Sequence, residues 1–271
     1  MPVTPFSFDA PPPTAMRVDL NCDMGESFGA FSIGDDAGVM PFVSSINVAC
    51  GFHGGDPSVM RATVHMAAAH GVAVGAHPGL PDLAGFGRRE LAVTAQEAYD
   101  MVVYQVGALQ AVTTAAGVTL QHVKPHGALY NMAARRPDLA DAIARAVHDV
   151  DTRLVLVGLS GSALITAGIT QGLRVASEVF ADRNYLADGA LAPRTAPNAL
   201  VTDVDIAAAR VLTMVRQHCV VAIDGTDIPI TPHTICIHGD APHAARLAQR
   251  LATTLRAARI AVLPLAAAMR T

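Results

Sequence analysis

The sequence predicts an α/β protein in which seven parallel strands and their helices form a single, incomplete or distorted β/α barrel. Short apolar, strand-like runs recur along the chain, and most are followed by a helix-like stretch. Six of these runs end in a cluster of Asp, Glu, His or Lys residues. Because parallel strands place their carboxyl ends on one face, these clusters should meet at one mouth of the barrel.

The strands are predicted from apolar runs rich in β-branched residues, at 17–21, 44–50, 72–76, 120–124, 154–158, 174–180 and 234–237. Helices are predicted over residues 57–70, 94–116, 138–150, 162–170, 203–218 and 242–258. A small hairpin is predicted over residues 220–230, because Asp224-Gly225 is a favoured two-residue turn. The strand count is one short of a complete eight-stranded barrel, so a distorted barrel is expected.

Capping and breaking residues set the helix boundaries. Pro57 lies in the first turn of its helix, directly after the predicted N-cap Asp56, and Gly71 ends that helix. Thr94 begins a capping box that opens the next helix, which Gly117 closes.

Three stretches contain no long regular element: residues 28–42, 78–89 and 186–202. Loops of this length inside a compact domain are usually functional. The loops hold Arg88, Arg89 and Arg194, which either clamp anionic groups or are solvated charges.

The composition excludes several classes of partner. The net charge is −4 and the basic residues are scattered, which argues against nucleic acid or an anionic membrane surface. No apolar run approaches the roughly 20 residues of a membrane span. The four cysteines form no CxxC pair, so a reduced, cytoplasmic protein is expected. Residues 1–15 are rich in proline and are predicted to be a disordered tail, and residues 16–271 to form one catalytic barrel domain.

Acidic side chains gather at the end of the first predicted strand. Asp19, Asn21 and Asp23 face one side by the alternation of an extended chain, and Glu26 follows them. Several acidic groups around one pocket suit proton transfer or cation binding. The alternative is that these carboxylates cap helices. We favour a functional role, because Asp19 interrupts an otherwise apolar strand.

Four histidines lie at or near the ends of predicted strands: His53, His77, His126 and His238. A lone histidine is more often structural than functional, but the repetition favours a shared site. Glycines flank His53, and they let the backbone approach a ligand closely. The remaining histidines fall on helices or are interpreted as structural: His65, His70, His122, His148, His218, His233 and His243.

Lys124 is the only lysine of the chain and ends the fourth predicted strand. There it can bind a carboxylate or phosphate oxygen, or transfer a proton if it is desolvated; the alternative is a surface lysine. Glu178 faces inward from the sixth strand, and Asp182 and Arg183 follow as either site residues or a structural ion pair. Asp240 completes the set of candidates.

Several familiar catalytic motifs are absent. The chain has no GxxxxGK[ST] or GxGxxG phosphate loop, no HExxH and no GxSxG. A divalent metal is chemically possible from Asp23, His53, His77 or His126, but their spacing matches no specific ligand motif, so the metal is left open.

Six sequence blocks resemble the signatures of the lactam-utilization family, which is the family of the 5-oxoprolinase A subunit. They are DLNCDMGE at 19–26, ACGFHGGDP at 49–57, GAHPG at 75–79, GFGRR at 85–89, KPHGALYN at 124–131 and EVFADR at 178–183. The blocks occur in the family's order, and the resemblance covers about residues 16–265. It implies a seven-stranded barrel of the glycoside hydrolase/deacetylase type, in agreement with the strand count.

The resemblance also implies an activity: ATP-dependent hydrolysis of the lactam 5-oxo-L-proline to L-glutamate, with ADP and phosphate, carried out with partner subunits B and C. On this hypothesis Lys124, supported by Arg183, binds anionic oxygens. Asp23, Glu178 and His53 are acid/base candidates. The histidines His77, His126 and His238 orient groups or share protons.

Two other functions fit the same residues. One is a metal-dependent amide hydrolase or carbohydrate deacetylase, which would need no ATP and would lose activity on chelation. The other is a non-catalytic subunit that binds the lactam and presents it to its partners.

Overall fold

Strand β1 (Arg17–Met24) closes the barrel, because it pairs with β2 (Ser45–Ala49) on one side and with β9 (Thr234–Ile237) on the other. The computed structural model describes residues 16–269, so the predicted tail at 1–15 lies outside the described residues. The other four barrel strands are β3 (Ala73–His77), β4 (Leu120–Val123), β5 (Val155–Leu159) and β6 (Arg174–Phe180). Each pairs in parallel with its neighbour, which confirms the predicted seven-stranded barrel.

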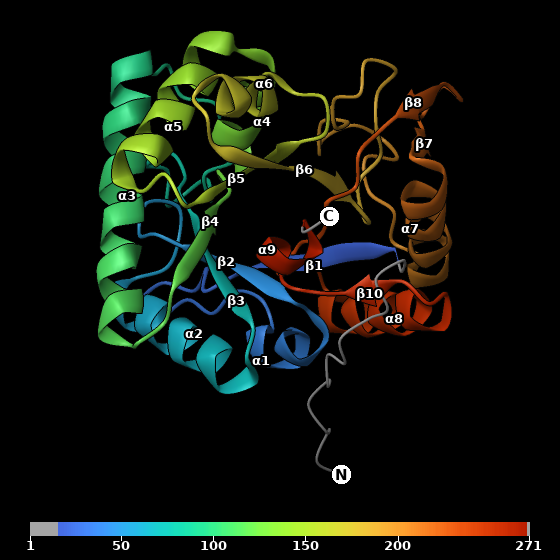
Figure 1. Cartoon of the computed structure of the whole chain (residues 1–271), viewed down its shortest axis with the longest axis horizontal. Coiled ribbons are helices and arrows are strands. Elements are labelled where there is room, and N and C mark those ends of the chain that lie inside the picture. Colours follow the sequence, from blue (N-terminus) through green and yellow to red (C-terminus); the bar gives the residue numbers. More distant parts are fainter. Residues whose placement is uncertain (1–15, 270–271) are drawn as a thin grey trace.

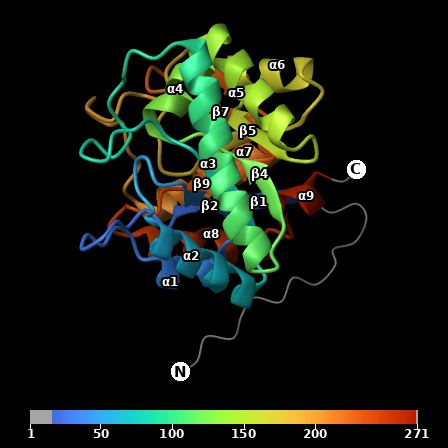
Figure 2. The same ribbon diagram turned by 90° about the vertical axis from the view of Figure 1, so that its left-hand side faces the viewer.

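Helices cover the outside of the barrel (Figure 1). They are α2 (Pro57–His70), α3 (Ala95–Ala115), α4 (Gly127–Arg135), α5 (Pro137–Val150), α6 (Ala163–Thr170), α7 (Val204–Gln217) and α8 (Ala244–Ala257). Figure 2 shows the long α3 running along the face turned to the viewer. Within residues 16–269, none of the helices combines the length and the apolarity that crossing a membrane requires.

The predicted capping signals act as expected. The side chain of Asp56 accepts hydrogen bonds from the backbone N–H groups of Ser58 and Val59, and Gly71 ends α2 in the left-handed conformation at φ 67°. The Thr94–Glu97 capping box opens α3 with both of its hydrogen bonds formed.

Several elements differ from the prediction. Helix α4 was not predicted, because its N-cap residue, His126, makes no side-chain capping bond and provides no capping signal in the sequence. Strand β1 extends to Met24 rather than ending at residue 21. Other unpredicted elements are short: α1 (Asp36–Val39), η1 (Met40–Phe42), β10 (Ala261–Val262), which pairs with β1, and α9 (Leu265–Ala268). The hairpin of β7 (Cys219–Val221) and β8 (Asp227–Pro229) forms as predicted.

The two faces of β1 have opposite chemistry, although both are buried. Val18, Leu20, Cys22 and Met24 belong to the apolar core. The intervening side chains, Asp19, Asn21 and Asp23, make polar contacts with residues of other barrel strands. The interior of the barrel is therefore hydrogen-bonded, and it positions the site described below.

One glycine makes room for this interior. A Cβ atom at Gly75 would overlap the imidazole of His122 on the neighbouring strand, and that ring is held by Asn47. We expect Gly75→Ala to lower the free energy of unfolding by about 1–3 kcal/mol, the usual cost of overpacking a core. Urea unfolding monitored by circular dichroism measures the effect.

Gly107→Ala is the matched control, because a Cβ added there in α3 would meet no heavy atom within 4 Å beyond its chain neighbours and the adjacent helix backbone. This substitution should be neutral or should stabilise the protein by up to about 1 kcal/mol, since alanine favours helix. Equal effects of the two substitutions would contradict the packing described for Gly75.

Candidate active site

The ammonium group of Lys124 lies at the centre of the polar interior. Its Nζ is 2.9 Å from Asp23 Oδ1 and 2.9 Å from Glu178 Oε1. It also donates to Asn21 Oδ1 at 3.2 Å and lies 3.1 Å from Cys236 Sγ. With a relative exposure of 2%, Lys124 is not the surface lysine of the alternative interpretation.

Neighbouring charges keep Lys124 and Asp23 ionised, although both side chains are buried. Burial opposes the charge on Lys124, but Asp23, Cys236 and Glu178 raise the pKa of the ammonium well above its usual value. Burial likewise opposes ionisation of Asp23, yet His77 and Lys124 hold the pKa of this carboxyl well below its usual value. Asp23 therefore carries its negative charge inside the barrel.

A second layer of hydrogen bonds lies deeper in the barrel. Asn21 donates from Nδ2 to Glu178 Oε1 at 3.0 Å and to Thr234 Oγ1 at 2.6 Å. Asp19 accepts from Ser44, Ser45 and Thr234. Burial raises the pKa of Asp19 to about 6, against the lowering by these hydroxyl donors. The structure thus places Asp19 beneath the other candidates, where it holds strands together.

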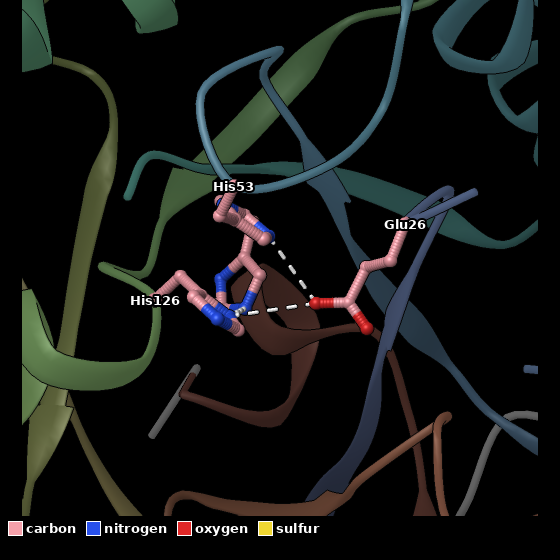
Figure 3. Close-up of side chains that lie close together, drawn as sticks. Glu26, His53 and His126 are labelled. Atoms are coloured by element: carbon pink, nitrogen blue, oxygen red, sulfur yellow. Dashed lines mark hydrogen bonds and ion pairs between the residues drawn. The ribbon is translucent and has the colours of Figure 1, made fainter. Parts of the chain in front are cut away.

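A cluster of histidines around Glu26 forms the other half of the site. His53 Nε2 and His126 Nδ1 both face Glu26 Oε1, at 3.2 and 3.4 Å (Figure 3). His77 connects this cluster to the lysine, since its Nε2 lies 3.0 Å from His126 Nδ1 and 3.3 Å from Asp23 Oδ2. His53, Lys124 and Glu178, which are far apart in the sequence, therefore belong to one continuous set of contacts.

Desolvation governs the protonation of most of these groups. Burial lowers the pKa values of His53 and His126 well below the usual value, so both imidazoles favour the neutral form. Burial, together with the charges of Asp23 and Asp240, raises the pKa of Glu26 well above the usual value. Groups with such displaced pKa values are typical of sites that transfer protons or bind ions.

A cavity of about 550 Å³ opens above this network. Its lining includes Asp23, His77, Lys124, His126, Arg183 and His238 from the predicted set. Arg88 and Arg194 from the irregular loops also line it. Burial and the nearby Arg88 lower the pKa of Arg194. The cavity is therefore rich in positive charge and suits an anionic ligand.

Two further predicted residues, Asp182 and Asp240, pair with side chains that line the cavity. Asp182 accepts from His238 Nδ1 at 2.9 Å, so the structural Asp182–Arg183 ion pair considered from the sequence is not the pairing that forms. Arg183 instead donates to the carbonyl oxygen of Ala192. Burial and Arg194 lower the pKa of Arg183 to about 10. Asp240 pairs with Arg88 at 2.8 Å.

Sequence reasoning missed three contributors. Asn47 donates to Asn21 and Asp23, and Cys236 contacts Lys124. Asn47 interrupts an apolar strand, which is the signal that singled out Asp19 and, applied evenly, would have found Asn47 as well. Cys236 belongs to the apolar core and gives no such signal. Tyr130 lines the cavity from the unpredicted α4; it lies in the KPHGALYN block, but the block alone did not single out its side chain. Burial and the charge of Glu178 raise the pKa of its hydroxyl well above the usual value.

The fold and site define a class. A closed parallel barrel with ionisable side chains gathered at the carboxyl ends of its strands is a β/α barrel of the kind that carries enzyme sites at its mouth. A model of the LamB/YcsF family matches residues 18–270. The chain belongs to the LamB/YcsF family.

Named relatives agree with this assignment. The A subunit of the 5-oxoprolinase from Tolumonas auensis is 63% identical over 239 residues, which cover 88% of this chain and 95% of that protein. The A subunit of the 5-oxoprolinase from Bacillus subtilis is 55% identical over 246 residues, covering 91% of this chain and 96% of that protein. The resemblance found in the sequence blocks is confirmed.

Solved structures support the fold. The lactam utilization protein from Thermus thermophilus matches with a TM-score of 0.87 and 49% identity, over 92% of this chain and 99% of that one. A putative cellobiose-phosphate cleavage protein from Enterococcus faecalis matches with a TM-score of 0.54 and 12% identity, over 94% and 99% of the two chains. This second likeness shows the barrel fold alone.

The buried His122 predicts a pH dependence of stability. Burial lowers its pKa from 6.5 to about 3. As the pH falls below 6.5, the unfolded chain therefore takes up a proton that folded His122 does not, and unfolding is favoured. Between about pH 7.5 and pH 5 this group should reduce the free energy of unfolding by about 2 kcal/mol.

His122→Gln should make the loss of stability over this pH range smaller than in the parent by that amount. Urea unfolding at the two pH values measures the difference, and the same substitution at the exposed His65 controls for removing a histidine as such. If the free energy of unfolding falls by the same amount in the parent and in His122→Gln between the two pH values, the imidazole of His122 is not held neutral in the folded protein.

Proposed function

We propose that this chain is the barrel subunit of a 5-oxoprolinase, which hydrolyses 5-oxo-L-proline to L-glutamate at the expense of ATP and works with partner subunits B and C. The names of the relatives, which are 55–63% identical over most of this chain, support the lactam as substrate. The observation that carries the proposal is the continuous set of ionisable contacts from His53 to Glu178 beneath a cationic cavity.

The reaction explains what the site must supply. A five-membered lactam is an amide, and water attacks it slowly. Phosphorylation of its carbonyl oxygen by ATP makes the carbon a better electrophile, and water then opens the ring. Such a site has to hold the lactam carboxylate, stabilise the phosphoryl charge and give a proton to the departing ring nitrogen.

The residues present suit these tasks. The cavity offers Lys124, Arg183 and Arg194 to anionic oxygens. Asp23 lies between the ammonium of Lys124 and the imidazole of His77, at 2.9 and 3.3 Å, where it can direct a proton toward either group. Asp182 fixes the orientation of His238 at the cavity wall.

ATP and the partner subunits belong to the same proposal. The sequence contains no GxxxxGK[ST] phosphate loop, so we assign ATP binding to a site completed by subunits B and C. The arginines of this chain then receive the phosphorylated lactam rather than the nucleotide.

Glu178 is the sharpest test of catalysis by this chain. Glu178→Gln removes the charge that Lys124 contacts, so we expect glutamate release by the assembled subunits with ATP to fall by at least about 100-fold. Lactam binding should stay within about tenfold, since Glu178 does not line the cavity. Glutamate release and equilibrium binding of 5-oxoproline measure the two quantities.

Glu97→Gln is the matched control, because Glu97 lies in the capping box of α3 and glutamine also supports such a box. Weakened binding with unchanged turnover in Glu178→Gln would identify a lactam-presenting, non-catalytic subunit. Glutamate formed by this chain alone, without ATP, would instead identify the metal-dependent amide hydrolase, which the Glu26 and histidine cluster favours.

Arg194 tests how the cavity holds its anionic ligand. Arg194→Gln should raise the KM for 5-oxoproline at least about tenfold and change kcat little, because the interaction is with the bound ligand rather than with the reacting atoms. Arg153→Gln is the control, since Arg153 is exposed and pairs with Asp151 outside the cavity lining. An unchanged KM would remove Arg194 from the ligand site.

A further inference from the structure

Two histidines at the barrel mouth are oriented by backbone carbonyl groups. His77 Nδ1 lies 2.8 Å from the carbonyl oxygen of Lys124, and His126 Nε2 lies 2.8 Å from that of Phe86. A carbonyl oxygen only accepts hydrogen bonds, so each of these ring nitrogens carries a hydrogen. In the neutral rings the opposite nitrogens, His77 Nε2 and His126 Nδ1, then carry lone pairs.

These two lone pairs face one another at 3.0 Å. Two acceptors at that distance repel unless a cation lies between or beside them, and the cation is either a proton or a metal ion. Carboxylate oxygens surround the same point, with Glu26 Oε1 3.4 Å from His126 Nδ1 and Asp23 Oδ2 3.3 Å from His77 Nε2. The two ring nitrogens and the two carboxylate oxygens therefore all offer lone pairs to a cation at this point.

We propose that Glu26 Oε1, His77 Nε2 and His126 Nδ1 bind one divalent transition-metal ion of the zinc class. The separations of 3.0 and 3.4 Å along this set match the edge of about 3.3 Å that a tetrahedron has when its metal–ligand distances are about 2.0 Å. All the ligand atoms of the cluster lie within 4.8 Å of one another. Two histidines and one glutamate are a ligand set that zinc uses at sites with an open fourth position.

The charge of the cluster favours a divalent ion over a proton. Three carboxylates, Asp23, Glu26 and Glu178, are buried here, and Lys124 is the one ammonium among their described contacts. With the imidazoles neutral and all three carboxylates deprotonated, the form in which such groups bind a metal, the cluster has two negative charges in excess. A single proton neutralises one of them, whereas a divalent cation neutralises both, and uncompensated buried charge is costly.

His53 belongs to the support of this site rather than to its ligands. Its ring stacks on that of His126 with centroids 3.6 Å apart and planes 1° from parallel. Because the two ring planes are parallel and stacked, the ring nitrogens of His53 and His126 do not point at a common position. The contact of His53 Nε2 with Glu26 Oε1 at 3.2 Å orients the glutamate, as partners of metal ligands commonly do (Figure 3).

An ion held by these residues would be accessible from the cavity. Asp23, His77 and His126 all line the cavity, whereas Glu26 and His53 do not. A zinc-class ion in this place would polarise a carbonyl oxygen or lower the pKa of a water molecule. The inference concerns ion binding by this chain alone, so its test is separate from that of the ATP-dependent reaction.

The test measures metal content and spectrum on the full chain, without ATP or partner subunits. Chain stripped with a chelator is loaded with Zn²⁺ or Co²⁺, dialysed, and analysed by elemental mass spectrometry and visible absorption. We expect one ion per chain and the intense Co²⁺ bands of a low-coordinate site. Glu26→Gln, His77→Ala and His126→Ala should each weaken binding by roughly 100-fold or more.

His53→Phe keeps an aromatic ring and removes the contact with Glu26, so it should retain one ion per chain with affinity reduced about tenfold. His65→Ala, at an exposed position of α2, is the control for surface histidine binding. Circular dichroism spectra of Glu26→Gln and the parent are compared, and equal spectra establish that the variant loses the metal without unfolding. No ion retained by the parent, or one ion retained by His77→Ala and His126→Ala, would overturn the proposal and leave a shared proton between the two rings.

Discussion

The ion pair of Lys124 with Asp23 and Glu178 is the interaction on which the rest of the site depends. The three side chains come from β1, β6 and the end of β4, and all are buried. Removing one partner of a buried pair usually costs about 3–5 kcal/mol, because the other charge is left without compensation. These two ion pairs therefore hold the ends of β1, β4 and β6 together beneath the cavity. Lys124, the only lysine of the chain, supplies the positive charge at this position.

Asp23 joins the two halves of this site. One carboxylate oxygen contacts Lys124, and the other contacts His77. A change in charge at Lys124 therefore affects His77, and the reverse, because both contact the same buried carboxylate with little water to screen the interaction. The loop residues at the rim of the cavity differ from the strand-end residues Asp23, His77 and Lys124 that form its floor. Arg88 and Arg194 come from loops that vary freely in sequence and length in barrel proteins, so the ligand can be selected at the rim while the floor retains its chemistry.

The sequence predicted which way the side chains of β1 face, but not how deep in the barrel they lie. The alternation of polar and apolar residues in β1 predicted that Asp19, Asn21 and Asp23 face one side, and this holds because a buried strand cannot reverse its faces. Depth along the barrel is a separate matter. Asp19 and Asp23 have the same facing, yet Asp19 bonds to hydroxyl groups inside the barrel and Asp23 lines the cavity. The strand register decides this depth, and the sequence of one strand does not contain it.

The sequence by itself determined the number and order of the barrel strands, the helix caps at Asp56 and Thr94, and the family, since these depend on local pattern and on contiguous motifs. Only the tertiary structure decided which charges meet. Asp182 pairs with His238 rather than with its chain neighbour Arg183, because the orientation of each side chain is set by the strand or loop that carries it. The carbonyl groups that orient His77 and His126 likewise come from residues 47 and 40 positions away. Long-range backbone contacts of this kind leave no signal in the sequence.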